Sequence, residues 1–113
     1  MPIFRAGDVV LVSFPFEDNL HKAKLRPAVV IANSHKNLEI AILKVTTQPP
    51  RSKSDYVILE WESAGLLKPS TVRVSKRIVV NTAAIVQTIG RLTAKDLNNV
   101  LAIYKNNNNY YLR

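Results

Sequence analysis

The chain has 113 residues, no cysteine and a formal net charge of +8. This length suits one domain and is too short for two domains with separate cores, so we predict a single domain over 1–113. The lack of cysteine excludes disulfides and thiolate-bound metals, and two histidines do not make a zinc site unaided, so no metal or cofactor is expected. A sequence pI near 10.1 favours an anionic partner, such as nucleic acid or an acidic protein, over a charge that serves solubility alone.

Membrane association is not expected from this sequence. No apolar run approaches the ~20 residues of a membrane span. The first residues lack the basic and then apolar pattern of a signal peptide. We therefore predict a cytoplasmic protein.

Seven short segments predict β-strands. Most are rich in β-branched residues and are separated by turn formers, as strands are. They are 9–14, 28–32, 38–46, 56–59, 71–75, 78–81 and 84–88. Between the fourth and fifth, residues 60–66 are expected to form one helical turn that Gly65 ends.

One helix is predicted near the C-terminus. Thr93 is a suitable N-cap, and Asp96 three residues later resembles the partner of a capping box. Four apolar residues then follow helical spacing; they are Leu97, Val100, Leu101 and Tyr104. The asparagine run 106–109 is expected to end the helix, leaving 106–113 as a loose tail. These elements predict a mainly β fold, a small bent sheet or open barrel capped by a helix.

Several segments together resemble a known family. They are 7–16 (GDVVLVSFPF), 25–31 (LRPAVVI), 44–48 (KVTTQ), 65–73 (GLLKPSTVR) and 89–93 (IGRLT). Their order and spacing resemble the MazF/PemK (Kid) family, the endoribonuclease toxins of bacterial type II toxin–antitoxin systems. The resemblance covers roughly residues 5 to 105, nearly the whole chain.

The resemblance implies an SH3-like barrel of about seven strands with a C-terminal helix, assembled as a homodimer. It implies metal-independent, sequence-selective cleavage of single-stranded RNA. In that reaction the 2′-hydroxyl attacks the phosphorus and leaves 2′,3′-cyclic phosphate and 5′-hydroxyl ends. It also implies an acidic, partly disordered antitoxin laid across a basic cleft, and operator DNA bound by the toxin–antitoxin complex.

Arg26 and Thr46 are the leading catalytic candidates. Arg26 precedes Pro27, which holds it extended at a stiff strand start, and a guanidinium can hold two phosphate oxygens. The family's catalytic arginine matches Arg26, and its active-site threonine matches Thr46. The alternatives are a surface ion pair for Arg26 and an ordinary strand residue for Thr46.

Arg73 and His21 are the further catalytic candidates. Kid-like members carry an Arg-x-Asp pair, and alternation puts Arg73 and Ser75 on one strand face. Here Ser75 stands where the aspartate would be, which leaves the general base open. Histidine has an unperturbed pKa near neutrality, so His21 is a candidate for that base, although a solvated loop histidine is the alternative.

Other residues are candidates for contacting RNA. Basic and polar loop residues flank the catalytic candidates and suit an electrostatic track for a single strand; they are Lys22, Lys24, Thr47, Gln48, Arg51, Lys53 and Ser75. Phe14, Phe16 and Trp61 are candidates for stacking on bases, with core packing as the alternative. His35 is assigned no role.

Two other functions remain open. A CcdB-like protein of the same fold would inhibit DNA gyrase by protein contact and would not need Arg26. A non-catalytic basic module would bind nucleic acid with a steep salt dependence and would not cut it. Arg26 and Thr46 favour the nuclease, and Ser75 keeps the binding module open.

Overall fold

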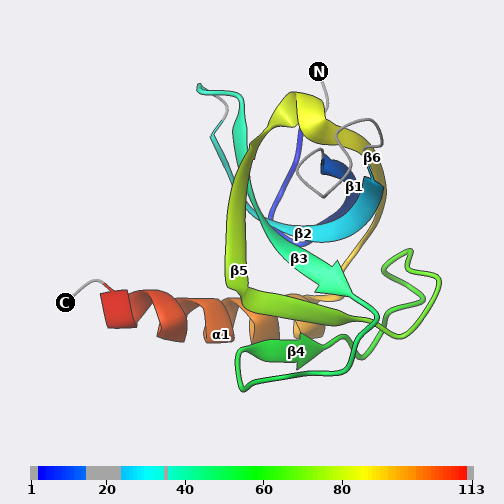
Figure 1. Ribbon diagram of the computed structural model, residues 1–113, viewed down its shortest axis with the longest axis vertical. Coiled ribbons are helices and arrows are strands. Elements are labelled where there is room, and N and C mark those ends of the chain that lie inside the picture. The colour runs from blue at the N-terminus through cyan, green and yellow to red at the C-terminus, as the bar shows by residue number, and fades with distance from the viewer. Residues whose placement is uncertain (1–2, 15–23, 35, 112–113) are drawn as a thin grey trace.

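The computed structural model describes residues 3–14, 24–34 and 36–111. Within them lie six strands, one short 3-10 helix and one α-helix (Figure 1). They are β1 (Asp8–Phe14), β2 (Lys24–Ser34), β3 (Glu39–Thr46), β4 (Asp55–Val57), β5 (Thr71–Asn81), η1 (Thr82–Ala84), β6 (Ile85–Arg91) and α1 (Ala94–Tyr111).

The strands form one antiparallel sheet in the order β4-β5-β3-β2-β1-β6. The sheet curls strongly, and α1 lies across its lower end (Figure 1). Its outer strands, β4 and β6, do not pair with each other, so the barrel is open. This confirms the prediction of a mainly β, barrel-like fold with a C-terminal helix.

The prediction of separate strands at 71–75 and 78–81 is wrong, because both belong to β5. Lys44 of β3 pairs with Arg73, but the adjacent Leu43 pairs with Arg77. Three extra residues of β5, from 74 to 76, therefore lie opposite a single step of β3. Such a bulge bends a strand without ending its pairing, and β5 turns a corner between its two halves (Figure 1).

Two apolar clusters pack on opposite faces of the sheet. We call the first the inner face; its buried residues are Phe4, Val10, Val12, Ala28, Val30, Ile40 and Ile42. Ile78 and Val80 of β5 and Ile85 of β6 pack against them, so the curled sheet encloses this face. We call the second the helix face; it includes Val9, Val29, Leu43, Val45 and Val72 and receives Val100 of α1.

The start of α1 matches its prediction, and its end does not. The Thr93 hydroxyl accepts a hydrogen bond from the backbone N–H of Asp96 at 3.2 Å, as an N-cap does. Leu97, Val100 and Tyr104 pack on the helix face, with Ile103 in place of the predicted Leu101. The helix continues through the asparagine run to Tyr111, so the expected helix end at 106–109 is wrong. The loose tail over 106–113 stays a prediction. Residues 112 and 113 lie outside the described part.

The turn over 59–66 lies unusually close to β6. Gly65 has φ +86°, and a Cβ there would lie 2.1 Å from the carbonyl oxygen of Ile89. A Cβ on Gly90 would lie 2.1 Å from the carbonyl oxygen of Ala64. Only glycine at both positions permits this approach of two backbones.

Candidate nucleic-acid site

One row of residues crosses four strands on the inner face. Ala28 of β2 pairs with Lys44 of β3, Lys44 pairs with Arg73 of β5, and Arg73 pairs with Asp55 of β4. Directly opposed residues of antiparallel strands point to the same side of a sheet. Because Ala28 belongs to the inner-face cluster, this row presents two cations and one carboxylate at the end of that face.

Arg26 and Thr46 belong to the neighbouring row. Arg26 pairs with Val12 of the inner-face cluster, so it starts from the same face. Thr46 lies two residues beyond Lys44, and Arg26 lies two residues before Ala28. The last pair of β2 and β3 is Ala28 with Lys44, so Arg26 and Thr46 follow it at the same end of the inner face. Both residues are half-buried.

Gln48 links three of the predicted site residues. Its side-chain oxygen accepts hydrogen bonds from Nη2 of Arg51 at 2.6 Å and from Nη2 of Arg73 at 3.0 Å. Its backbone N–H donates to the hydroxyl of Thr46 at 3.2 Å. Side chains linked in this way lose rotamer freedom, so this end of the sheet presents a partly ordered set of polar groups.

Asp55, which the sequence analysis did not select, holds the two arginines from the other side. Its Oδ2 pairs with Nη1 of Arg73 at 3.1 Å and accepts the backbone N–H of Arg51 at 2.8 Å. The side chains of Asp55 and Arg73 are only 3% and 12% exposed. This ion pair compensates much of the charge of Arg73, whereas Arg51 remains exposed.

Lys44 is the second residue that the sequence analysis did not select. Ile40, Ile42 and Lys44 follow one another at two-residue spacing on the inner face, and Lys44 is the first charged residue of the series. This break in an apolar series is the signal that the sequence offers for Lys44. Asp55 carries no such signal, because its contact with Arg73 depends on the pairing of β4 with β5.

The remaining RNA-contact candidates are exposed around this network. Lys24 begins β2, and Thr47 and Lys53 lie on either side of Gln48 and Arg51 in the chain. Ser75 lies in the bulge of β5, also exposed, and the hydrogen bonds that hold Arg73 come from Asp55 and Gln48 instead.

Some predicted residues lie away from this network, and others lie outside the described part of the chain. Trp61 packs against the helix-face cluster, which supports core packing over base stacking. His21, Lys22, Phe16 and His35 lie outside the described residues, as does the side chain of Phe14.

A buried carboxylate from α1 contacts the other face of β4. Asp96 of α1 is fully buried and accepts hydrogen bonds from the hydroxyl of Tyr56 at 2.5 Å and from the backbone N–H groups of Leu59 and Glu60. Burial opposes ionisation of Asp96, but these hydrogen bonds outweigh it and hold the pKa below its usual range. Burial, together with the bond to Asp96, raises the pKa of Tyr56. The carboxylate thus joins α1 to β4, in addition to its contact with the N-cap residue Thr93.

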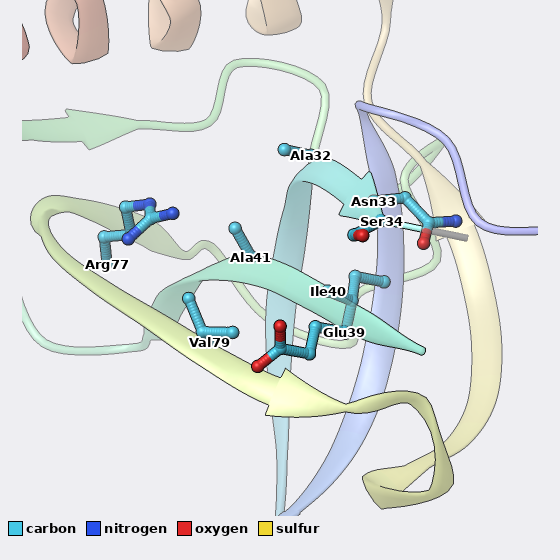
Figure 2. A pocket seen from close by; sticks show the side chains of 8 residues that line it. All are labelled: Ala32, Asn33, Ser34, Glu39, Ile40, Ala41, Arg77 and Val79. Atoms are coloured by element: carbon cyan, nitrogen blue, oxygen red, sulfur yellow. The ribbon is translucent and has the colours of Figure 1, made fainter. Parts of the chain in front are cut away.

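A pocket of about 230 Å³ lies at the other end of the sheet. Its side chains come from β2, β3 and β5 (Figure 2). The lining residues are Ala32, Asn33, Ser34, Glu39, Ile40, Ala41, Arg77 and Val79. No predicted site residue lines it, so it is separate from the network around Gln48.

Among the described residues, no group of three or more His, Asp and Glu side chains is placed to hold a metal ion. In the same part of the chain, no helix has the length and apolar character that crossing a membrane requires.

Comparison with protein families gives a match over residues 5–105, to the PemK-like, MazF-like toxins of type II toxin–antitoxin systems. The chain belongs to this family. No curated protein sequence matches it.

Solved structures of MazF proteins share the fold. MazF of Deinococcus radiodurans has a TM-score of 0.72 at 15% identity, covering 94% of this chain and 96% of that chain. The Mycobacterium tuberculosis toxin MazF-mt6 has a TM-score of 0.71 at 15% identity, with coverages of 88% and 93%. A mycobacterial endoribonuclease in complex with its cognate antitoxin has a TM-score of 0.70 at 12% identity, with coverages of 89% and 90%. The similarity therefore extends over nearly the whole family fold.

Proposed function

We propose that this toxin is a metal-independent, sequence-selective endoribonuclease that cuts single-stranded RNA. The observation that carries the proposal is the pairing of Ala28 with Lys44, because Arg26 and Thr46 each lie two residues beyond that pair on the inner face. A guanidinium and a hydroxyl on one face, beside further cations, suit the oxygens of a phosphodiester.

RNA supplies its own nucleophile in this reaction. The 2′-oxygen attacks phosphorus as its proton passes to a base, the new P–O2′ bond forms, and the P–O5′ bond breaks as the 5′-oxygen takes up a proton. The protein must stabilise the charge that grows on the phosphorane oxygens. Arg26 supplies a permanent positive charge for this purpose, and the Thr46 hydroxyl donates to one of the oxygens. His21 is our candidate for the base.

The partners proposed with this activity follow from charge and from the relatives. A net charge of +8 suits both RNA and an acidic antitoxin. One mycobacterial relative has been solved with its cognate antitoxin. We extend this to the present chain as an acidic, partly disordered antitoxin that covers the cations of the inner face, with a homodimeric toxin and operator DNA bound by the toxin–antitoxin complex.

The testing experiment is incubation of the purified protein with a long single-stranded RNA in excess EDTA, followed by mapping of the cut ends. We expect discrete cuts with 2′,3′-cyclic phosphate and 5′-hydroxyl termini, and we expect R26A to abolish them while remaining folded. The matched control is R77A, which removes the same charge from an exposed position at the pocket of Figure 2. Full activity in R26A would contradict the assigned site.

A non-catalytic binding module is the second candidate, and one observation favours it. Asp55 already compensates the charge of Arg73, and Ser75 supplies no carboxylate beside it. In that case the wild-type protein would bind the RNA in EDTA with a steep salt dependence and leave it uncut. Failure both to bind and to cut would favour the CcdB-like inhibition of gyrase.

A further inference from the structure

Lys44 is a cation at the end of an apolar surface. It follows Ile40 and Ile42 on the inner face of β3, and both of those side chains are almost completely buried. Lys44 itself is half-buried. Because the lysine ammonium group is strongly hydrated, lysine is seldom buried unless its charge is paired or serves a function.

The neighbours of Lys44 bring its ammonium group near the proposed scissile phosphate. Arg73 is directly opposite on β5, which places the two Cβ atoms about 5 Å apart. Ala28, opposite on β2, is fully buried and carries no charge, so Arg73 is the charged cross-strand neighbour of Lys44. Thr46 lies two residues along the same face, a separation of about 7 Å that a lysine side chain can span.

The charge balance of this row favours an anionic ligand. Asp55 is engaged with Arg73, and Lys44 has no side-chain hydrogen bond or ion pair with any of the described residues. Lys44 and Arg73 thus face each other across paired strands, and the one carboxylate of the row, Asp55, lies on the far side of Arg73. Opposed like charges destabilise a sheet, and a bound phosphate would relieve their repulsion.

We infer that Lys44 is a catalytic residue of this toxin. Its ammonium group donates a hydrogen bond to a non-bridging oxygen of the scissile phosphate and stabilises the additional negative charge of the phosphorane. Arg26 and Thr46 hold the same phosphate from the neighbouring row. This inference rests on the proposed endoribonuclease function and adds to it a cation that the family resemblance did not supply.

The competing explanation is that Lys44 covers apolar surface with its stem and extends its charge into water. The two explanations differ in what they predict for K44M, which keeps an unbranched side chain and removes only the charge. If the charge stabilises the phosphorane, loss of the charge lowers the maximal cleavage rate. If the stem alone matters, that rate does not change.

The test is single-turnover cleavage of an RNA that the wild-type protein cuts, measured in EDTA at saturating protein. We expect K44M to lower the maximal rate by about 100-fold, the usual effect of removing one charge-stabilising donor. We expect K44R to recover much of that loss. The control K105M removes a lysine from an exposed position on α1 and should retain the wild-type rate.

Folding is checked by thermal melting without RNA. K44M should melt at the wild-type temperature or above it, because it removes a repulsion from the free protein; K44Q serves in its place if K44M does not fold. A maximal rate within threefold of wild type would overturn the inference, as would a variant that only binds RNA more weakly. Failure of the wild-type protein itself to cut RNA would instead contradict the proposed function, so the two failures are distinguishable.

Discussion

Asp55 and Tyr56 are neighbours on β4, yet they serve two different regions of the molecule. Successive residues of a strand point to opposite faces. Asp55 therefore meets Arg73 on the side of the candidate site, while Tyr56 meets Asp96 of α1 and packs against the helix-face cluster. At the candidate site, the Asp55 carboxylate of β4 binds two arginines. At the helix face, the Asp96 carboxylate of α1 binds Tyr56 of β4. A strand of three residues thus connects the site to the core.

The two carboxylates differ in what surrounds them. Asp96 accepts its hydrogen bonds from the Tyr56 hydroxyl and from two backbone N–H groups, all of which would be left unsatisfied without it. Asp55 is bound by one charged side chain and one exposed backbone group. We therefore expect Asp96 to matter mainly for stability and Asp55 mainly for the geometry of the site.

The largest expected effect on stability is that of D96A. It leaves two backbone donors and one hydroxyl without their acceptor, which should cost about 3 kcal/mol of the free energy of unfolding. Urea unfolding followed by circular dichroism measures this cost. A loss below about 1 kcal/mol would show that water replaces the carboxylate and that Asp96 does not hold the region together.

D55A should cost less stability and more activity. We expect a loss of about 1–2 kcal/mol from the broken ion pair. We also expect a cleavage rate at least about tenfold lower per folded molecule, because Arg51 and Arg73 lose a shared anchor. D55N keeps the shape and one acceptor, so its stability and cleavage rate should lie between those of D55A and the wild-type protein. If D55A unfolded as readily as D96A and cleaved normally when folded, the proposed division between the carboxylates would be wrong.

The pH dependence of stability gives a further test of the role of Asp96. The lowered pKa of Asp96 means that its contribution is fully present above the ordinary aspartate pKa near 3.9 and is lost as the pH falls through the folded value. D96N should therefore flatten the acid side of the stability curve, by at most about 1.4 kcal/mol per pH unit for one proton. An unchanged acid slope in urea titrations between about pH 5 and 2 would contradict this assignment.

The smallest effect is expected for Y56F. The Tyr56 hydroxyl donates to Asp96 and accepts from the side-chain amide of Asn99, so its removal should cost about 1 kcal/mol. Its raised pKa predicts that the stabilisation persists below about pH 10 and is lost as the pH rises through the folded value. The variant should lose this alkaline dependence while RNA cleavage at neutral pH stays normal. Reduced cleavage would show that β4 transmits changes from the core to the site.

Local signals predicted much of this fold. The N-cap at Thr93 and the strand predicted over 38–46 depend on a few consecutive residues, and both are found in the structure. The bulge at 74–76 was not predictable in this way, since its cause is the pairing of β5 with a partner some thirty residues earlier in the chain. For the same reason, this one bent strand was predicted as two.

In the candidate site, too, the features that depend on cross-strand pairing were not predictable from local sequence. Arg26, Thr46, Gln48 and Arg73 were selected from residue type and resemblance, and the register or hydrogen bonds now connect them. Asp55 and Lys44 were missed because their importance comes from cross-strand neighbours. Asp96 was interpreted only as a local capping partner, but its carboxylate also accepts hydrogen bonds from donors more than thirty residues away.

The close approach of Gly65 and Gly90 has a consequence for solubility. Gly90 pairs with Val9 of the helix-face cluster, so its missing side chain would point to that face of β6. The turn over 59–66 lies against this face and leaves no room there even for a methyl group. It thereby covers the end of the apolar helix face, and exposed apolar patches promote aggregation. A side chain at Gly90 would push the turn away, and the resulting defect would appear first as aggregation during expression of the protein.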